Sequence, residues 1–117
     1  MRADMATTNM KKTIERKLSQ LEGKLARVRG DLLALGPMRP GSITRQYRDP
    51  ARKRQAFYQL SYTHRGRGRS EYVRPEHLAT LRKEIAAYKR FRKLVETWVA
   101  LSLEASQLRI KLTVESP

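Results

Sequence analysis

The 117-residue sequence contains no cysteine and only two histidines, His64 and His77. Without cysteine the chain can form neither disulfides nor thiolate metal sites, and a reducing, cytoplasmic location is expected. Neither histidine has a plausible catalytic or ligating partner at a suitable spacing. No phosphate-binding glycine loop is present, and the acids are scattered along expected helices. We therefore expect no metal, no cofactor and no enzymatic activity.

Long apolar runs are also missing. No stretch approaches the ~18 apolar residues of a membrane span, and residues 1–12 lack the apolar core of a secretory signal. Hydrophobic residues make up 39% of the chain, which is typical of a helical or coiled-coil protein with a small core. What the chain has in excess is positive charge, with a net charge of +15. At this length we expect one domain or one elongated unit.

Apolar residues in the N-terminal third recur at alternating spacings of four and three residues. These seam positions are Ile14, Leu18, Leu21, Leu25, Val28, Leu32 and Leu35. Heptad spacing of this kind predicts a coiled-coil helix over residues 9–36. Thr8 or Asn9 is the expected N-terminal cap, and Gly36 is the expected left-handed residue at the end, just before Pro37. Residues 1–8 are expected to be disordered.

A second helix is predicted over residues 75–112, beginning at Pro75, which suits a first helical turn. Its seam positions are Leu78, Leu81, Ile85, Tyr88, Phe91, Val95, Trp98, Leu101, Ala105, Leu108 and Leu112. A helix of this length measures ~55 Å, so its distal half needs a helical partner. The first helix offers a seam of similar length, which predicts an antiparallel helical hairpin. The seams could also pair two copies of the chain as a homodimer. Residues 113–117 are expected to be disordered.

Residues 37–74 have a different character and predict a small antiparallel β-sheet. Ile43 to Arg48 read as a short strand, Asp49-Pro50 as a turn, and residues 55–64 as a strand with Tyr58, Leu60 and Tyr62 on one face. Residues 65–69, RGRGR, are the expected hairpin connection, and residues 70–74 the return strand. A sheet of two or three strands must lie on a helix to be stable. The predicted fold class is α+β, a long helical hairpin with this sheet inserted between its helices.

The arginines of residues 39–74 point to a partner. This segment holds nine arginines and one lysine against two acids, an excess of +8. A like-charge surplus repels itself, and the commonest external counter-charge is a phosphate backbone. Arginine also suits bidentate phosphate contacts. The predicted nucleic-acid-binding residues are Arg45, Arg48, Arg52, Lys53, Arg54, Arg65, Arg67, Arg69, Arg74, Arg82 and Lys89.

Two features of this region have more than one interpretation. The RGRGR segment is either a flexible arm that enters a DNA groove or a hairpin tip that its charge keeps soluble. The aromatic residues either stack on unpaired bases or fill the interface between sheet and helix. We expect Tyr58 and Tyr62 to fill that interface, and Tyr47 and Phe57 are the candidates for base stacking.

The favoured function is non-enzymatic binding of double-stranded DNA through phosphates. One alternative is an RNA-binding subunit of a ribonucleoprotein, in which aromatic stacking would matter. Another is a coiled-coil adaptor whose basic patch docks an acidic protein partner. Membrane-surface binding is disfavoured because the basic residues lack a neighbouring exposed apolar stripe.

Five short motifs stand at residues 35–37, 41–47, 58–62, 72–73 and 88–94. They are L-G-P, G-S-(I/L)-x-x-(Q/R)-Y, Y-x-L-S-(Y/R), Y-V after a basic hairpin, and Y-x-x-(F/Y)-(R/K)-x-L. In these motifs residues 35–112 resemble a family of short bacterial proteins that looks associated with mobile genetic elements. Many members resemble one another further in a cysteine knuckle, which residues 48–54, RDPARKR, replace. The resemblance supports the predicted architecture and implies that the zinc or thiol site is lost here. The association with mobile elements fits DNA binding, although the family supplies no established activity.

Overall fold

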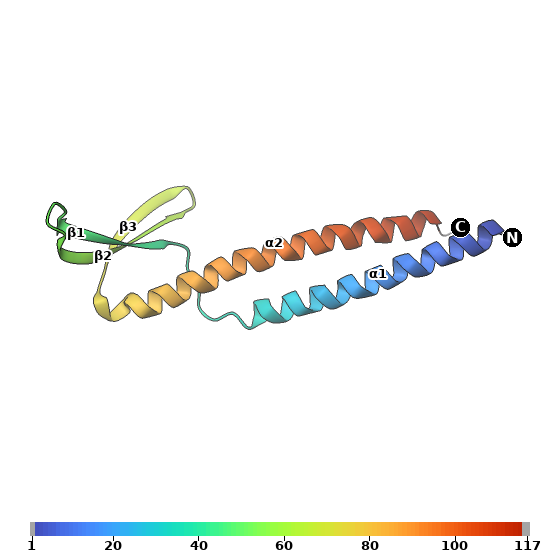
Figure 1. The fold of residues 1–117 in the computed structure, drawn as a ribbon, viewed down its shortest axis with the longest axis horizontal. Helices are drawn as coiled ribbons and strands as arrows, with labels where there is room; N and C mark the ends of the chain where they lie inside the picture. Colours follow the sequence, from blue (N-terminus) through green and yellow to red (C-terminus); the bar gives the residue numbers. More distant parts are fainter. Residues whose placement is uncertain (1, 116–117) are drawn as a thin grey trace. The chain divides into compact units, whose positions relative to one another are not determined.

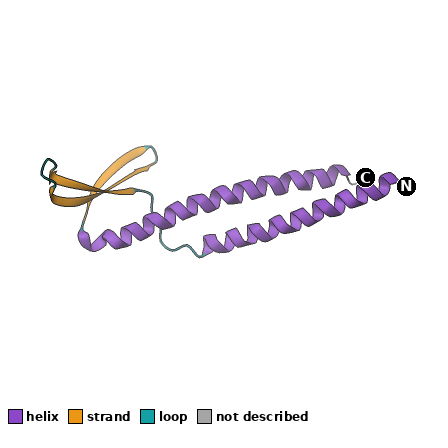
Figure 2. Cartoon of the chain, in the orientation of Figure 1, coloured by secondary structure: helices purple, strands orange, loops and turns teal. Residues whose placement is uncertain are grey.

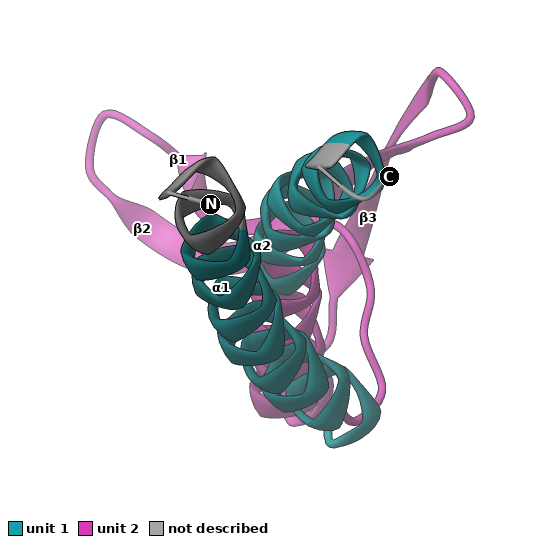
Figure 3. Ribbon diagram, turned by 90° about the vertical axis from the view of Figure 1, so that its right-hand side faces the viewer, with its two compact units in different colours: residues 1–34, 93–117 teal, residues 35–92 magenta. Residues whose placement is uncertain are grey.

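A computed structural model describes residues 2–115 and has an α+β fold, in which two helices flank a three-stranded antiparallel sheet in the sequence (Figures 1 and 2). The elements are α1 (Arg2–Leu33), β1 (Ser42–Asp49), β2 (Arg54–His64), β3 (Arg67–Val73), the 3₁₀ turn η1 (Pro75–His77) and α2 (Leu78–Glu115). The chain forms two compact units (Figure 3). Unit 1 comprises residues 1–34 and 93–117, and unit 2 comprises residues 35–92.

Unit 1 is the predicted antiparallel helical hairpin. Ile14, Leu18 and Leu21 of α1 are buried against Ala105 of α2, which has no exposed surface. Further along, the guanidinium of Arg29 lies 5.3 Å from the ring centroid of Trp98. The heptad seam of α1 is thus covered within one chain, because apolar side chains that recur every 3.5 residues form one continuous stripe. A homodimer through the seam stays a prediction.

The helix boundaries differ from the predicted ones. Helix α1 already begins at Arg2, so residues 2–8 are helical and neither Thr8 nor Asn9 is a cap. No glycine or proline lies in residues 2–8 to oppose helix formation. At its other end α1 stops at Leu33, and Gly36 does not adopt a left-handed conformation. The chain turns at Ala34, whose N–H still bonds the Gly30 carbonyl at 3.0 Å, well before Pro37.

Helix α2 continues three residues beyond its predicted end, since residues 113–115 are helical; residues 116–117 lie outside the described residues. Pro75 does begin the helical segment, as predicted, within η1. One seam position is wrong, because Val95 is exposed and Leu94 is half-buried in its place. The steps Phe91–Val95–Trp98 and Phe91–Leu94–Trp98 both total seven residues, so the spacing alone does not decide which of the two faces the core.

Unit 2 is a sheet of strand order β1-β2-β3 on the first turns of α2. Leu60 and Val73 of the sheet are buried against Ile85 of α2. The tyrosines predicted to line this interface, Tyr58 and Tyr62, are packed against the same cluster. This core fixes the sheet on the helix through the face that carries Leu60 and Val73.

Strand register assigns each residue to one of the two faces. In antiparallel strands directly paired residues share a face, and side chains alternate along each strand. The helix face carries Ile43, Arg45, Tyr47, Asp49, Arg54, Ala56, Tyr58, Leu60, Tyr62, His64, Arg67, Arg69, Glu71 and Val73. The open face carries Ser42, Thr44, Gln46, Phe57, Gln59, Ser61, Thr63, Gly68, Ser70 and Tyr72.

The RGRGR segment is more regular than predicted. Only Arg65 and Gly66 form the turn, with φ of 52° and 77°, and His64 pairs directly with Arg67. Two consecutive positive φ angles suit a two-residue hairpin turn, because their twist matches that of the flanking strands. Arg67, Gly68 and Arg69 therefore belong to β3, and the segment is the tip of a paired hairpin rather than a loose five-residue arm.

Gly41, just before β1, holds the chain close to β2 and should not tolerate a side chain. Its φ is 143°, and a Cβ atom there would lie 2.9 Å from Leu60 Cδ1 and 3.2 Å from the Ser61 carbonyl oxygen. We expect Gly41→Ala to destabilise unit 2 by about 1–3 kcal/mol. The measurement is hydrogen exchange of the amides in residues 42–73.

Gly68→Ala is the matched control, since its Cβ atom would meet nothing nearer than Thr63 Oγ1 at 4.0 Å and its φ is not positive. Alanine in a strand should leave protection unchanged or raise it slightly. Equal protection in both variants would show that the close approach at Gly41 contributes nothing.

Candidate nucleic-acid interface

Positive charge is concentrated in unit 2. Residues 35–92 hold 15 lysines and arginines against 4 acids, a net charge of +11 out of +15 for the chain. Unit 1 holds 11 basic residues against 7 acids, a net charge of +4. The smaller number of acids in unit 2 means that its charge is not balanced from within.

The ion pairs also show that most of the positive charge is not neutralised within the protein. Among the described residues, Arg74 is the only arginine or lysine that pairs with a carboxylate, at 3.8 Å from Glu76, and both side chains are well exposed. Glu71 instead accepts a hydrogen bond of 3.1 Å from the hydroxyl of Tyr62. Exposed cations without internal partners are free to bind an external anion.

The first cluster of these cations surrounds the turn between β1 and β2. We call it the first basic turn; its residues are Arg48, Arg52, Lys53 and Arg54. Asp49-Pro50 starts this turn as predicted: the Lys53 N–H donates to the Pro50 carbonyl at 3.3 Å, and the Arg52 N–H lies 3.4 Å from Asp49 Oδ1. The turn is therefore organised by its backbone, and all four basic side chains remain exposed.

The second cluster lies at the turn between β2 and β3. We call it the second basic turn; its residues are Arg65, Arg67 and Arg69, all exposed. With Tyr62 and His64 they line a concave pocket of about 580 Å³ that contains no acidic residue. Three guanidinium groups around one hollow can surround a phosphate group from several sides.

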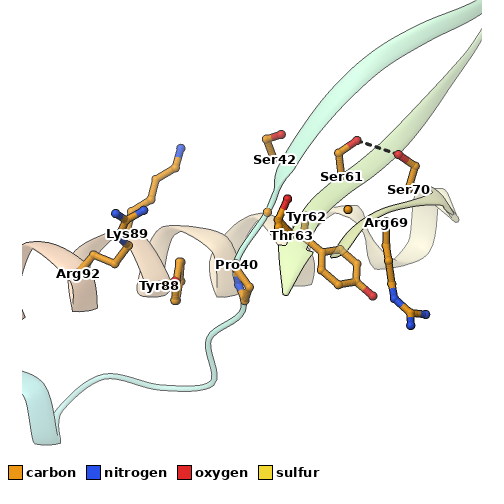
Figure 4. A pocket seen from close by; sticks show the side chains of 12 residues that line it. Pro40, Ser42, Ser61, Tyr62, Thr63, Arg69, Ser70, Tyr88, Lys89 and Arg92 are labelled. Carbon is orange, nitrogen blue, oxygen red and sulfur yellow. Dashed lines mark hydrogen bonds between the residues drawn. The ribbon is translucent and has the colours of Figure 1, made fainter. Parts of the chain in front are cut away.

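A larger pocket of about 630 Å³ opens between the sheet and α2 (Figure 4). Tyr88, Lys89 and Arg92 approach it from the helix, and hydroxyl groups of the sheet approach it from the other side. Among the hydroxyls, Ser61 and Ser70 lie 3.3 Å apart across β2 and β3. The lining has cations, hydroxyls and aromatic rings but no acid, a combination that suits a sugar–phosphate backbone.

The remaining predicted cations serve partly to hold the sheet. The guanidinium groups of Arg45 and Arg82 lie over the rings of Tyr47 and Tyr58, at 5.4 and 5.5 Å from the centroids. Such cation–π contacts orient a cation without neutralising it. Arg74 is paired with Glu76, as described, and is thus the least available of the predicted set.

Arg39, which is not among the predicted binding residues, contacts both the sheet and α2. Its guanidinium lies 4.9 Å from the ring centroid of Tyr62, and its backbone N–H donates to the Glu84 carbonyl at 3.2 Å. It links the segment before β1 to both the sheet and α2. The sequence signal was weak, because one arginine among many cannot be assigned a partner before the register is known.

The aromatic residues are divided between the two faces. Tyr47 is half-buried on the helix face, whereas Phe57 is half-buried on the open face. Tyr72, which the sequence analysis did not list as a site residue, lies on the open face opposite Gln59 and is 61% exposed. Tyr72 is therefore the exposed aromatic residue of the open face, with the half-buried Phe57 on the same face, whereas Tyr47 lies on the other.

Within residues 2–115 no group of histidines and acids is arranged to hold a metal ion, and neither helix could cross a membrane. Comparisons with protein-family models, curated proteins and solved structures give no match for this chain. None of them bears on the family resemblance, which stays a prediction.

Proposed function

We propose that this protein binds double-stranded DNA without catalysing a reaction, mainly by phosphate contacts from the two basic turns of unit 2. The observation that supports this most is a net charge of +11 in 58 residues, whose arginines and lysines are exposed apart from the half-buried Arg39 and, apart from Arg74, have no ion-pair partner. Phosphates are the densest counter-charge that a cell offers such a surface.

The neutral open face strengthens the proposal. It carries serine, threonine and glutamine side chains and no acid, so it adds hydrogen-bond donors without repelling a phosphate backbone. Hydroxyl and amide side chains contact phosphates and sugars frequently in protein–DNA interfaces. Binding would then combine charge at the turns with neutral contacts between them, as in an accessory component of a larger nucleoprotein assembly.

Salt dependence provides the test. If six to eight phosphates are neutralised, log K for duplex DNA should fall with log salt at a slope of roughly −5 to −7. Fluorescence anisotropy of a labelled duplex, titrated at four salt concentrations, measures this slope. A slope near zero would contradict the proposal.

The second candidate is binding of single-stranded RNA, favoured by the aromatic rings of Tyr72 and Phe57 on the open face. Aromatic rings on a sheet can stack on unpaired bases, each contributing ~1–3 kcal/mol. Gln59 between them supplies an amide that could hydrogen-bond to base edges. Against this, only Tyr72 of the two rings is well exposed, and Phe57 is half-buried.

A further inference from the structure

The two basic turns lie at opposite ends of one strand. Strand β2 runs from Arg54, in the first basic turn, to His64, next to the second, over 11 residues. At ~3.3 Å per residue its ends are ~33 Å apart. The magenta sheet of Figure 3 shows the two turns projecting to different sides of unit 2.

This separation is set by the fold. Both turns are joined by β2, and Leu60 near its middle is 1% exposed in the core that anchors the sheet on α2. Seven paired positions connect β2 to β1 and seven connect it to β3. The turns therefore cannot approach each other without breaking the sheet or its core.

The distance matches a repeat of duplex DNA. Equivalent positions on one side of the double helix recur every 10–10.5 base pairs, or roughly 34–36 Å. A single strand has no such fixed repeat, because its backbone is flexible. Two cation clusters ~33 Å apart can therefore meet phosphates on the same side of a duplex one helical turn apart.

The surface between the clusters is compatible with this placement. No acidic residue lies on the open face, and Ser42, Ser61 and Ser70 form one row of paired positions across all three strands. By register Arg54, Arg67 and Arg69 belong to the helix face, so they would reach a duplex on the open face from the ends of the strands. Between the turns the duplex would pass over hydroxyl and amide groups, which can donate to its backbone. A carboxylate there would have repelled it.

We propose that the two basic turns bind one duplex simultaneously, so that the ligand of unit 2 is a DNA duplex of at least about one helical turn. This inference rests on the proposed function. Because the turns are held rigidly, the second contact becomes intramolecular once the first has formed, and a duplex long enough for both should bind much more tightly than a shorter one.

The experiment is a duplex-length series. Labelled duplexes of about 8 to about 20 base pairs, of matched composition, are titrated with the full chain by anisotropy at low salt. Each Kd is corrected for the number of equivalent positions on the duplex. The expected result is a rise in affinity of about tenfold or more between about 8 and about 14 base pairs, and little change beyond.

Three variants make the test specific. R48A/R52A/R54A alters the first basic turn and spares Lys53, whose φ is 52°. R65N/R67A/R69A alters the second, with asparagine at the left-handed position because it tolerates positive φ. Each should reduce the step with duplex length to less than about threefold, because only one turn remains to bind. The control K12A/R16A/K24A removes three exposed charges from α1 and should retain the step.

The outcomes separate the two proposals. A smooth rise in affinity with length, without a step, would overturn the spanning arrangement and leave DNA binding itself intact. Persistence of the step in both turn variants would also overturn it. Failure to bind even the longest duplex at low salt would overturn both the inference and the proposed function.

Discussion

Leu60→Ala should destabilise unit 2 by about 2–5 kcal/mol, enough to leave its sheet largely unfolded. Leu60 is 1% exposed, and the buried core around it contains only Val73 and Ile85, with partly buried neighbours at its margin. Removing three carbons from so small a core leaves a cavity that few side chains are available to fill. Hydrogen exchange of the amides in residues 42–73 measures the effect.

Leu103→Ala is the control, because it removes the same atoms from a side chain that is 59% exposed on α2. Its cost should stay within about 0.5 kcal/mol. The fluorescence of Trp98, the only tryptophan, reports on unit 1 and should change little in either variant. Undiminished protection of the sheet in Leu60→Ala would contradict the core described here.

R65N/R67A/R69A should lower the affinity for a duplex of about two helical turns by about 100-fold at about 0.1 M salt. Each lost phosphate contact removes a factor of several in affinity and about 0.9 from the salt slope. The slope should therefore become less negative by about 3. Anisotropy titrations at several salt concentrations give both numbers.

If binding depended on net charge alone, any variant that loses three positive charges would lose the same affinity. K12A/R16A/K24A lowers the net charge from +15 to +12, as does the turn variant, but its residues lie on α1. Its affinity should stay within about threefold of the unaltered chain, since exposed charges outside the two basic turns that make no direct phosphate contact are screened by salt. Equal losses in the two variants would mean that binding follows total charge and that the second basic turn is not a site.

The helical part of the fold was predictable because its signal is periodic. Seven apolar positions at heptad spacing specify one stripe, and the structure covers that stripe as expected. The helix ends were less predictable. Residues 2–8 include good helix formers such as Ala3, Met5 and Ala6, but the apolar repeat begins only at Ile14 and so does not mark the start. Gly36 lies beyond a helix that had already stopped at Leu33.

The sheet was predictable as an element but not in its register. Alternation placed Tyr58, Leu60 and Tyr62 on one face correctly. Whether the RGRGR turn has two residues or five decides which residues of β3 share that face, because a shift of one residue exchanges the faces. Tyr72 was therefore not predicted to be an exposed aromatic residue, because its face depends on the register of β3.

From the sequence, the candidate site could be predicted only as a surplus of positive charge. Counting arginines between residues 39 and 74 gives the excess, but the two-ended arrangement depends on β2 connecting both turns. Likewise, the contacts of Arg45 and Arg82 with tyrosine rings require the folded sheet. Composition indicates the class of partner, and topology indicates how that partner would lie.

The most direct test of the central claim is an anisotropy comparison of duplex DNA, single-stranded DNA and structured RNA of equal length, each at low and moderate salt. The account predicts tightest binding to the duplex, with an affinity that falls steeply as salt rises. A clear preference for RNA would contradict it and favour base stacking by Phe57 and Tyr72. No binding to any of the three at low salt would contradict it as well, and would assign the two basic turns to an acidic protein partner.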